Sequence, residues 1–102
     1  MNKATIIEMV LFKVKEGIEI EFAQKELIKI NDFLAKQEGF ISRKISLSDD
    51  EQFLDIVYWT DMESANAAVE KSMRNPDLLK IFSIIDEDTQ IFKHFQIFND
   101  TV

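Results

Sequence analysis

The order of strand-like and helix-like segments is the feature that most constrains this fold. Four segments carry the β-branched and aromatic enrichment that is typical of strands: residues 5–14, 40–48, 53–59 and 90–98. Between the first two of them, residues 19–37 repeat apolar side chains at spacings of three and four, which predicts one long helix. A polar connection joins the second and third strands, as in a hairpin. The first half of the chain is therefore predicted to run strand, helix, strand, strand.

A second helical region lies between the third and fourth strands. Thr60 and Glu63 have the spacing of a capping box, so a helix is predicted to start there. Asn75 and Pro76 fit the cap and the first position of a further short helix, which is expected to end near Ile85. The acidic residues that follow, 86–88, are predicted to form a loop before the last strand.

The resulting βαββαβ order predicts an α+β fold with the ferredoxin-like arrangement. In that arrangement a four-stranded antiparallel sheet carries its helices on one face. The 102 residues suit one domain, residues 1–102. A chain of this size buries only about 65% of the surface that it would expose when unfolded, so it stands to gain stability from association.

Composition excludes several classes of function. The net charge of −7 with interspersed acids and bases argues against nucleic-acid binding, which needs a basic surface. The chain has no Cys and one His, so most transition-metal sites are excluded, and two Gly are too few for a phosphate-binding loop. No metal and no cofactor are therefore expected. Charged residues interrupt the N-terminal apolar run and no stretch reaches membrane-spanning length, so no membrane partner and a cytoplasmic location are predicted.

Strand alternation divides the predicted sheet into two faces. The more apolar set is predicted to pack under the helices, with Arg43 and Lys93 reaching outward at its edge and Tyr58 in the core: Ile7, Met9, Leu11, Ile41, Ile45, Leu47, Leu54, Ile56, Tyr58, Ile91, Phe95 and Ile97. The other set mixes aromatic and ionisable residues: Ile6, Glu8, Val10, Phe12, Ser42, Lys44, Ser46, Phe53, Asp55, Val57, Trp59, Phe92, His94, Gln96 and Phe98. An exposed patch of so many aromatic rings is rare in monomers, so a second copy is predicted to cover it, enclosing a partly dry interior.

Glu8 and His94 are the candidate catalytic residues. His94 is the only side chain whose unperturbed pKa lies near neutrality, and the fourth strand lies beside the first in this fold, so the two residues are predicted to meet. Each has a structural alternative, namely a histidine satisfied by hydrogen bonds and a carboxylate paired inside the protein.

Four further residues are candidates for substrate binding. Trp59 could stack on a planar ligand or could be a core or interface residue. Asp55 could act as a carboxylate of raised pKa, could pair with Lys44 or His94, or could simply be exposed to solvent. Phe12 and Lys44 share the predicted face and would line the same interior.

Several segments together resemble the antibiotic biosynthesis monooxygenase-like proteins of the dimeric α+β barrel superfamily: Met9–Gly17, Gly39–Arg43, Asp55–Thr60, Ala65–Ala68 and His94–Ile97. The resemblance spans essentially the whole chain. It implies a homodimer whose sheets face each other, and a ligand pocket in each subunit between sheet and helices. That pocket would compete with the interior inferred from alternation.

The resemblance implies several activities. Some members are cofactor-free monooxygenases of aromatic, polyketide-type compounds, others degrade haem, and related barrels cyclise polyketides. Haem degradation is not expected, because position 8 is Glu rather than Asn and the second helix lacks a His. The cyclising relatives use a His early in the first strand, where this chain has none. The leading expectation is a cofactor-independent monooxygenase with a small hydrophobic or aromatic ligand. The alternatives are a non-catalytic small-molecule-binding or stress-response dimer, and a scaffold whose interior is filled by side chains.

Overall fold

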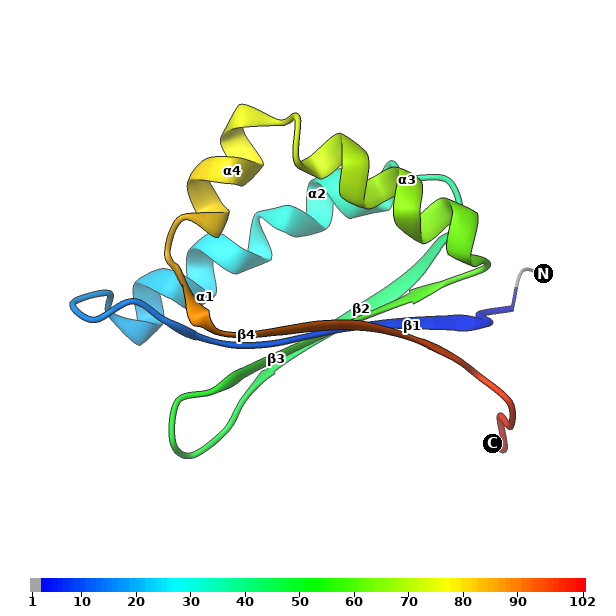
Figure 1. Cartoon of the computed structure of the whole chain (residues 1–102), viewed down its shortest axis with the longest axis horizontal. Coiled ribbons are helices and arrows are strands. Elements are labelled where there is room, and N and C mark those ends of the chain that lie inside the picture. Colours follow the sequence, from blue (N-terminus) through cyan, green and yellow to red (C-terminus); the bar gives the residue numbers. More distant parts are fainter. Residues whose placement is uncertain (1–2) are drawn as a thin grey trace.

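A four-stranded antiparallel sheet carries all the helices on one side (Figure 1). The computed structural model describes residues 3–102. The elements are β1 (Ile6–Val14), α1 (Ile20–Ile28), α2 (Ile30–Ala35), β2 (Phe40–Leu47), β3 (Phe53–Trp59), α3 (Met62–Ser72), α4 (Pro76–Phe82) and β4 (Ile85–Gln96). The strand order is β2-β3-β1-β4, and each neighbouring pair is antiparallel. The predicted ferredoxin-like α+β fold is confirmed.

The predicted helix over 19–37 is broken at Lys29 into α1 and α2. The Nη1 atom of Arg43 donates to the carbonyl of Leu27 and to Oδ1 of Asn31, at 2.8 Å each, so it bridges the break from the sheet below. At the break, the Lys29 amide donates to the Glu26 carbonyl three residues back, at 3.2 Å. A side chain that bonds the backbone within a helix is a common cause of such breaks.

The caps of the other helices are partly as predicted. The cap of α3 is Asp61 rather than Thr60, since an oxygen of Asp61 accepts from the Ser64 amide at 2.7 Å, so the predicted capping box is wrong. Asn75 caps α4 as expected, with Oδ1 accepting from the Leu78 amide at 3.2 Å. None of the helices within residues 3–102 has the length and apolar character needed to cross a membrane.

The last strand starts five residues earlier than predicted, because the expected acidic loop is a bulge within β4. The pairing of β1 with β4 shifts between Leu11, opposite Ile91, and Lys13, opposite Asp86. The hydroxyl of Thr89 accepts from the Lys13 amide at 2.8 Å and so replaces a ladder bond. A bulge of this kind bends a strand without ending it.

The helices cover the opposite face from the one predicted for β1, β3 and β4. Phe12, Phe53 and Trp59 are at most 2% exposed and form the centre of the core. The covered face is the face of the sheet under the helices: Ile6, Glu8, Val10, Phe12, Phe40, Arg43, Ile45, Leu47, Phe53, Asp55, Val57, Trp59, Phe92 and His94. The open face carries the other residues of the strands, including Tyr58, Lys93 and Lys44. In β2 the prediction is right, since Ile45 and Leu47 pack against the core.

The pairing of buried charges makes the observed arrangement possible. The ionisable residues of the covered face pair with one another, so burying them costs far less than burying isolated charges. Separately, the register of β2 shifts between Phe40 and Ser42, which brings Phe40 to the covered face together with Arg43. The helices therefore cover the face that carries the charges and leave a largely apolar face open.

Candidate functional site

A cavity of about 640 Å³ lies between the covered face and the helices. The sheet contributes residues from β1, β3 and β4: Glu8, Val10, Phe12, Asp55, Val57, Trp59, Ile85, Glu87, Gln90 and Phe92. The helices and the segments beside them contribute mostly apolar side chains: Leu27, Ile30, Phe33, Leu34, Ala68, Val69, Ser72, Met73, Leu79, Phe82 and Ser83. This is the place implied by the family resemblance. The interior predicted from alternation, facing away from the helices, was placed on the wrong side.

The cavity opens between the end of α3, α4 and β4. Its lining residues there, Met73, Leu79 and Phe92, are 58%, 40% and 44% exposed, whereas Trp59 and Leu27 at its inner end are almost completely buried. Small-molecule sites are typically apolar clefts of about 300–1,000 Å³ with a few polar groups that orient the ligand. The size of this cavity and its mostly apolar lining lie within that range.

Glu8 and His94 meet as predicted. They are direct partners in the ladder between β1 and β4, and Nε2 of His94 lies 2.9 Å from Oε1 of Glu8. Both side chains are largely buried, at 11% and 14% exposed. Glu8 lines the cavity, and the ring of His94 packs edge-on against Phe92 at 5.1 Å. Glu8 is therefore the member of the pair that can contact a ligand, and His94 supports it from the edge strand.

Burial raises the pKa of Glu8 above its ordinary value of 4.5. The hydrogen bond and the charge of His94 act in the opposite direction, while the negative charge of Asp55 raises the pKa of Glu8 further. A carboxylate whose proton affinity is raised in an apolar cavity is a stronger base than a solvated one, as a proton acceptor at neutral pH requires.

Trp59 ends β3 at the inner end of the cavity. Its ring is completely buried and packs edge-on against Phe40 at 5.9 Å. Its indole N–H has no hydrogen-bond partner within residues 3–102. A buried donor without a partner carries a free-energy cost.

Asp55 is paired with Arg43, which alternation correctly assigned to the helix-facing side of β2. Nε and Nη2 of Arg43 donate to the two oxygens of Asp55, at 2.9 and 2.6 Å. The Arg43 side chain is 4% exposed, so the prediction that it reaches outward is wrong. The predicted partners of Asp55, Lys44 or His94, are replaced by this bidentate ion pair. Opposite charges on neighbouring strands at the same face would have been the signal for it.

The remaining two predicted binding residues, Phe12 and Lys44, lie on opposite faces of the sheet. Phe12 lines the cavity and stacks on Phe53 at 5.3 Å between ring centroids. Lys44 lies on the open face, where its Nζ sits 5.5 Å from the centre of the Tyr58 ring. The prediction that Lys44 shares an interior with Glu8 is therefore wrong. The functional roles of Glu8, His94, Trp59, Asp55 and Phe12 stay predictions.

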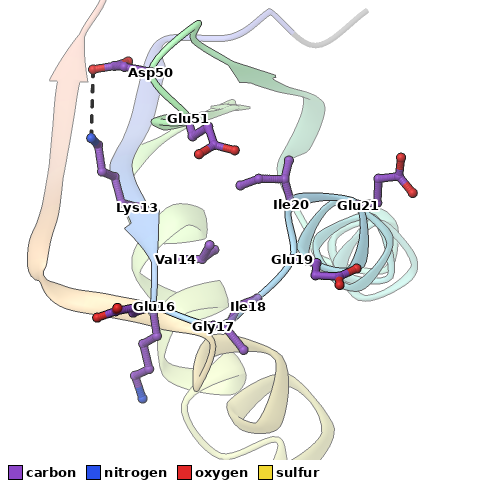
Figure 2. Close-up of a pocket in the computed structure, with 11 residues that line it drawn as sticks. Lys13, Val14, Glu16, Gly17, Ile18, Glu19, Ile20, Glu21, Asp50 and Glu51 are labelled. Carbon is purple, nitrogen blue, oxygen red and sulfur yellow. Dashed lines mark ion pairs between the residues drawn. The ribbon is translucent and has the colours of Figure 1, made fainter.

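A second depression, of about 500 Å³, lies between the end of β1, the start of α1 and the β2–β3 hairpin. Figure 2 shows that the carboxylates of Glu19 and Glu21 point away from Asp50, which approaches Lys13 at 4.0 Å. The acidic groups do not converge on a common point. Across residues 3–102, no group of three or more potential ligand side chains could hold a metal ion.

No family model and no curated protein matches this sequence. Solved structures do match its fold. A point mutant of SnoaB, a cofactor-independent oxygenase from Streptomyces nogalater, has a TM-score of 0.79 and 16% identity, covering 96% of this chain and 97% of that one. A monooxygenase from the gene ActVA-Orf6 of Streptomyces coelicolor, in complex with the ligand nanaomycin D, has a TM-score of 0.73 and 12% identity, with coverage of 97% and 92%.

A dimeric ferredoxin-like protein from an uncultured marine organism also matches, with a TM-score of 0.77, 12% identity and coverage of 98% and 93%. At these identities the likeness concerns the fold. The predicted resemblance to antibiotic biosynthesis monooxygenase-like proteins is thus confirmed at the level of the fold, over nearly the whole chain.

Proposed function

We propose that this chain is a cofactor-independent oxygenase that removes a proton from a small, planar, weakly acidic compound. The observation that carries the proposal is the position of Glu8. It lines an apolar cavity of about 640 Å³, is bonded to His94, and has a raised pKa. The fold likeness to SnoaB, a cofactor-independent oxygenase, supports it.

The chain's own residues would perform three tasks. Glu8 takes the proton from a phenol or from an acidic C–H beside a carbonyl, and His94 stabilises the protonated pair through its hydrogen bond. The N–H of Trp59 donates to the oxygen on which the anion develops, once the bound ligand has displaced the side chains that cover the indole. The apolar walls exclude water, so the ligand anion reacts with molecular oxygen rather than with solvent protons.

Anthrone is a suitable probe, because it has three fused rings and a C–H made acidic by its ketone. One anthrone and one O₂ give one anthraquinone and one water, so no cofactor is needed for balance. We expect the protein to accelerate oxygen uptake. Glu8→Gln should lower kcat by about 10²-fold or more, since a positioned base typically contributes 10²–10⁴. Lys44→Gln, on the open face, is the matched control and should retain full activity.

The second candidate is a non-catalytic binder of the same class of ligand, which needs the cavity and the Trp59 donor but no base. Trp59 is the only tryptophan, so quenching of its fluorescence reports ligand in the cavity. Anthrone binding without oxygen uptake would favour the binder. Oxygen uptake that survives intact in Glu8→Gln would refute the assigned base, and absence of both binding and turnover would count against the ligand class.

We also propose that a second copy of the chain covers the open face. Ile91 and Phe95 are 48% and 43% exposed there. They join further apolar residues across all the central strands: Ile7, Met9, Leu11, Leu54, Ile56 and Tyr58. Soluble monomers rarely expose a continuous apolar face of this kind. The two cavities would then lie on the outer sides of the paired sheets, one in each subunit.

Size-exclusion chromatography with light scattering tests this arrangement. A particle of twice 11.9 kDa at micromolar concentration is expected. A mass of 11.9 kDa alone would refute it.

A further inference from the structure

A buried ion pair between Arg43 and Asp55 lies at the wall of the cavity. Arg43 binds both oxygens of Asp55 and also bonds Leu27 and Asn31 at the break between α1 and α2. It thereby connects β2, β3 and the broken helix. Asp55 itself lines the cavity, two residues along β3 from Val57, which is the ladder partner of Glu8.

Few other charged groups face Glu8. From β4 His94 bonds it directly, from β3 Asp55 acts on it through space, and Arg43 of β2 lies behind Asp55. The cavity-lining residues of the helices carry no titratable group. Lys15 and Glu87, the remaining charged residues of the lining, are exposed to solvent and therefore screened.

We propose that Arg43 and Asp55 are positioning residues for Glu8. Asp55 places a negative charge beside the Glu8–His94 pair and so favours keeping a proton on that pair, while Arg43 limits this effect by holding both oxygens of Asp55. The inference rests on the proposed function only in treating Glu8 as the reactive group.

The charges of Asp55 and Arg43 determine in which direction each substitution should shift the titration midpoint of Glu8. Asp55→Asn removes the neighbouring negative charge and leaves the cation of Arg43, so ionised Glu8 becomes easier to form and its titration midpoint falls. Arg43→Gln leaves the charge of Asp55 uncompensated, so the midpoint rises. Arg43→Lys keeps the charge but loses the bidentate fork, so its midpoint should lie between wild type and Arg43→Gln.

Carbon-13 NMR of the Glu8 carboxyl, followed from about pH 4 to 9 in the ligand-free protein, measures the midpoint. His94 is the only histidine, so its ring signals report the same hydrogen-bonded pair without overlap. Asp50→Asn removes an equal charge at the solvent-exposed Lys13–Asp50 pair and is the matched control. It should titrate like wild type.

Opposite shifts in Asp55→Asn and Arg43→Gln, with none in Asp50→Asn, would support the proposal. Shifts in the same direction, or an Asp55→Asn midpoint equal to that of Asp50→Asn, would overturn it. If Arg43→Gln loses its native amide spectrum, the comparison of Asp55→Asn with Asp50→Asn decides alone. Because no step of this test uses turnover, a protein without oxygenase activity can still pass it, so the two proposals fail separately.

Discussion

The two faces of the sheet are built from alternate residues of the same strands, yet they differ in polarity and in burial. The covered face carries Glu8, His94, Asp55 and Arg43, each bonded to another member of the group. The open face carries aliphatic and aromatic side chains, with Lys44 and Lys93 lying near the rings of Tyr58 and Phe95. The more polar face is the one that the helices bury.

The difference matches what the two proposals require of each face. A cavity for a reactive ligand needs ionisable groups away from water, and such groups are tolerated only when they are paired. A face that meets a second copy of the same sheet needs apolar area and few charges. Buried polarity marks the candidate site, and exposed apolarity marks the candidate interface.

The largest expected difference between the two faces is in the loss of folding stability when an apolar side chain is removed. Phe12→Ala removes a ring that is 1% exposed and stacked on Phe53, so it should cost about 3–5 kcal/mol of unfolding free energy. Leu11→Ala, one residue away on the open face, should cost less in an isolated subunit and act mainly through association. Urea denaturation at several protein concentrations tests this. Equal, concentration-independent losses for the two variants would contradict the comparison.

The next effect concerns the open face alone. Ile56→Asp should cost about 1–3 kcal/mol per copy by burying a carboxylate in the proposed interface, and two copies meet in a dimer. The dimer dissociation constant should therefore rise by about 30-fold to 10⁴-fold, since 1.4 kcal/mol corresponds to a factor of ten. Analytical ultracentrifugation measures it. Asn66→Asp, which makes a similar charge change on the exposed side of α3, should leave the dimer intact, and equal weakening by both would point to net charge instead.

The smallest expected effect is on the pH dependence of folding stability, which depends on Glu8 of the covered face. The pKa of Glu8 is higher in the folded protein than the ordinary value of 4.5, mainly because of burial. The folded state therefore holds this proton more tightly than the unfolded chain does. The stability that Glu8 contributes is present below pH 4.5 and is lost as pH rises through its folded value.

Glu8→Gln removes this dependence, so its stability relative to wild type should rise with pH across that window. Denaturant titrations at a series of pH values measure the difference. Glu70→Gln, at an exposed helical site, should show no such trend. A flat difference for Glu8→Gln would mean that Glu8 is not perturbed by burial.

Local sequence signals were enough to predict most of the fold. Strand-type residues, helical spacing and the Asn75–Pro76 cap specify the elements and their order, because each depends on neighbours within a few residues. The pairing of Glu8 with His94 could also be predicted from the sequence, since this topology places the first and fourth strands side by side and their central residues opposite each other. The break at Lys29 and the bulge in β4 did not follow, because both depend on bonds from distant strands.

The sequence by itself therefore determined the strand and helix regions, their order and the central pair, whereas only the tertiary structure decided which face of the sheet the helices cover. Alternation divides the residues of a strand into two sets. When both sets are rich in apolar residues, it does not indicate which set is buried. Which face is buried depended on whether each charged side chain found a partner there. Arg43 reaches Asp55, Leu27 and Asn31 only when β2, β3 and the broken helix are assembled, and that network offsets the free-energy cost of burying the charged face.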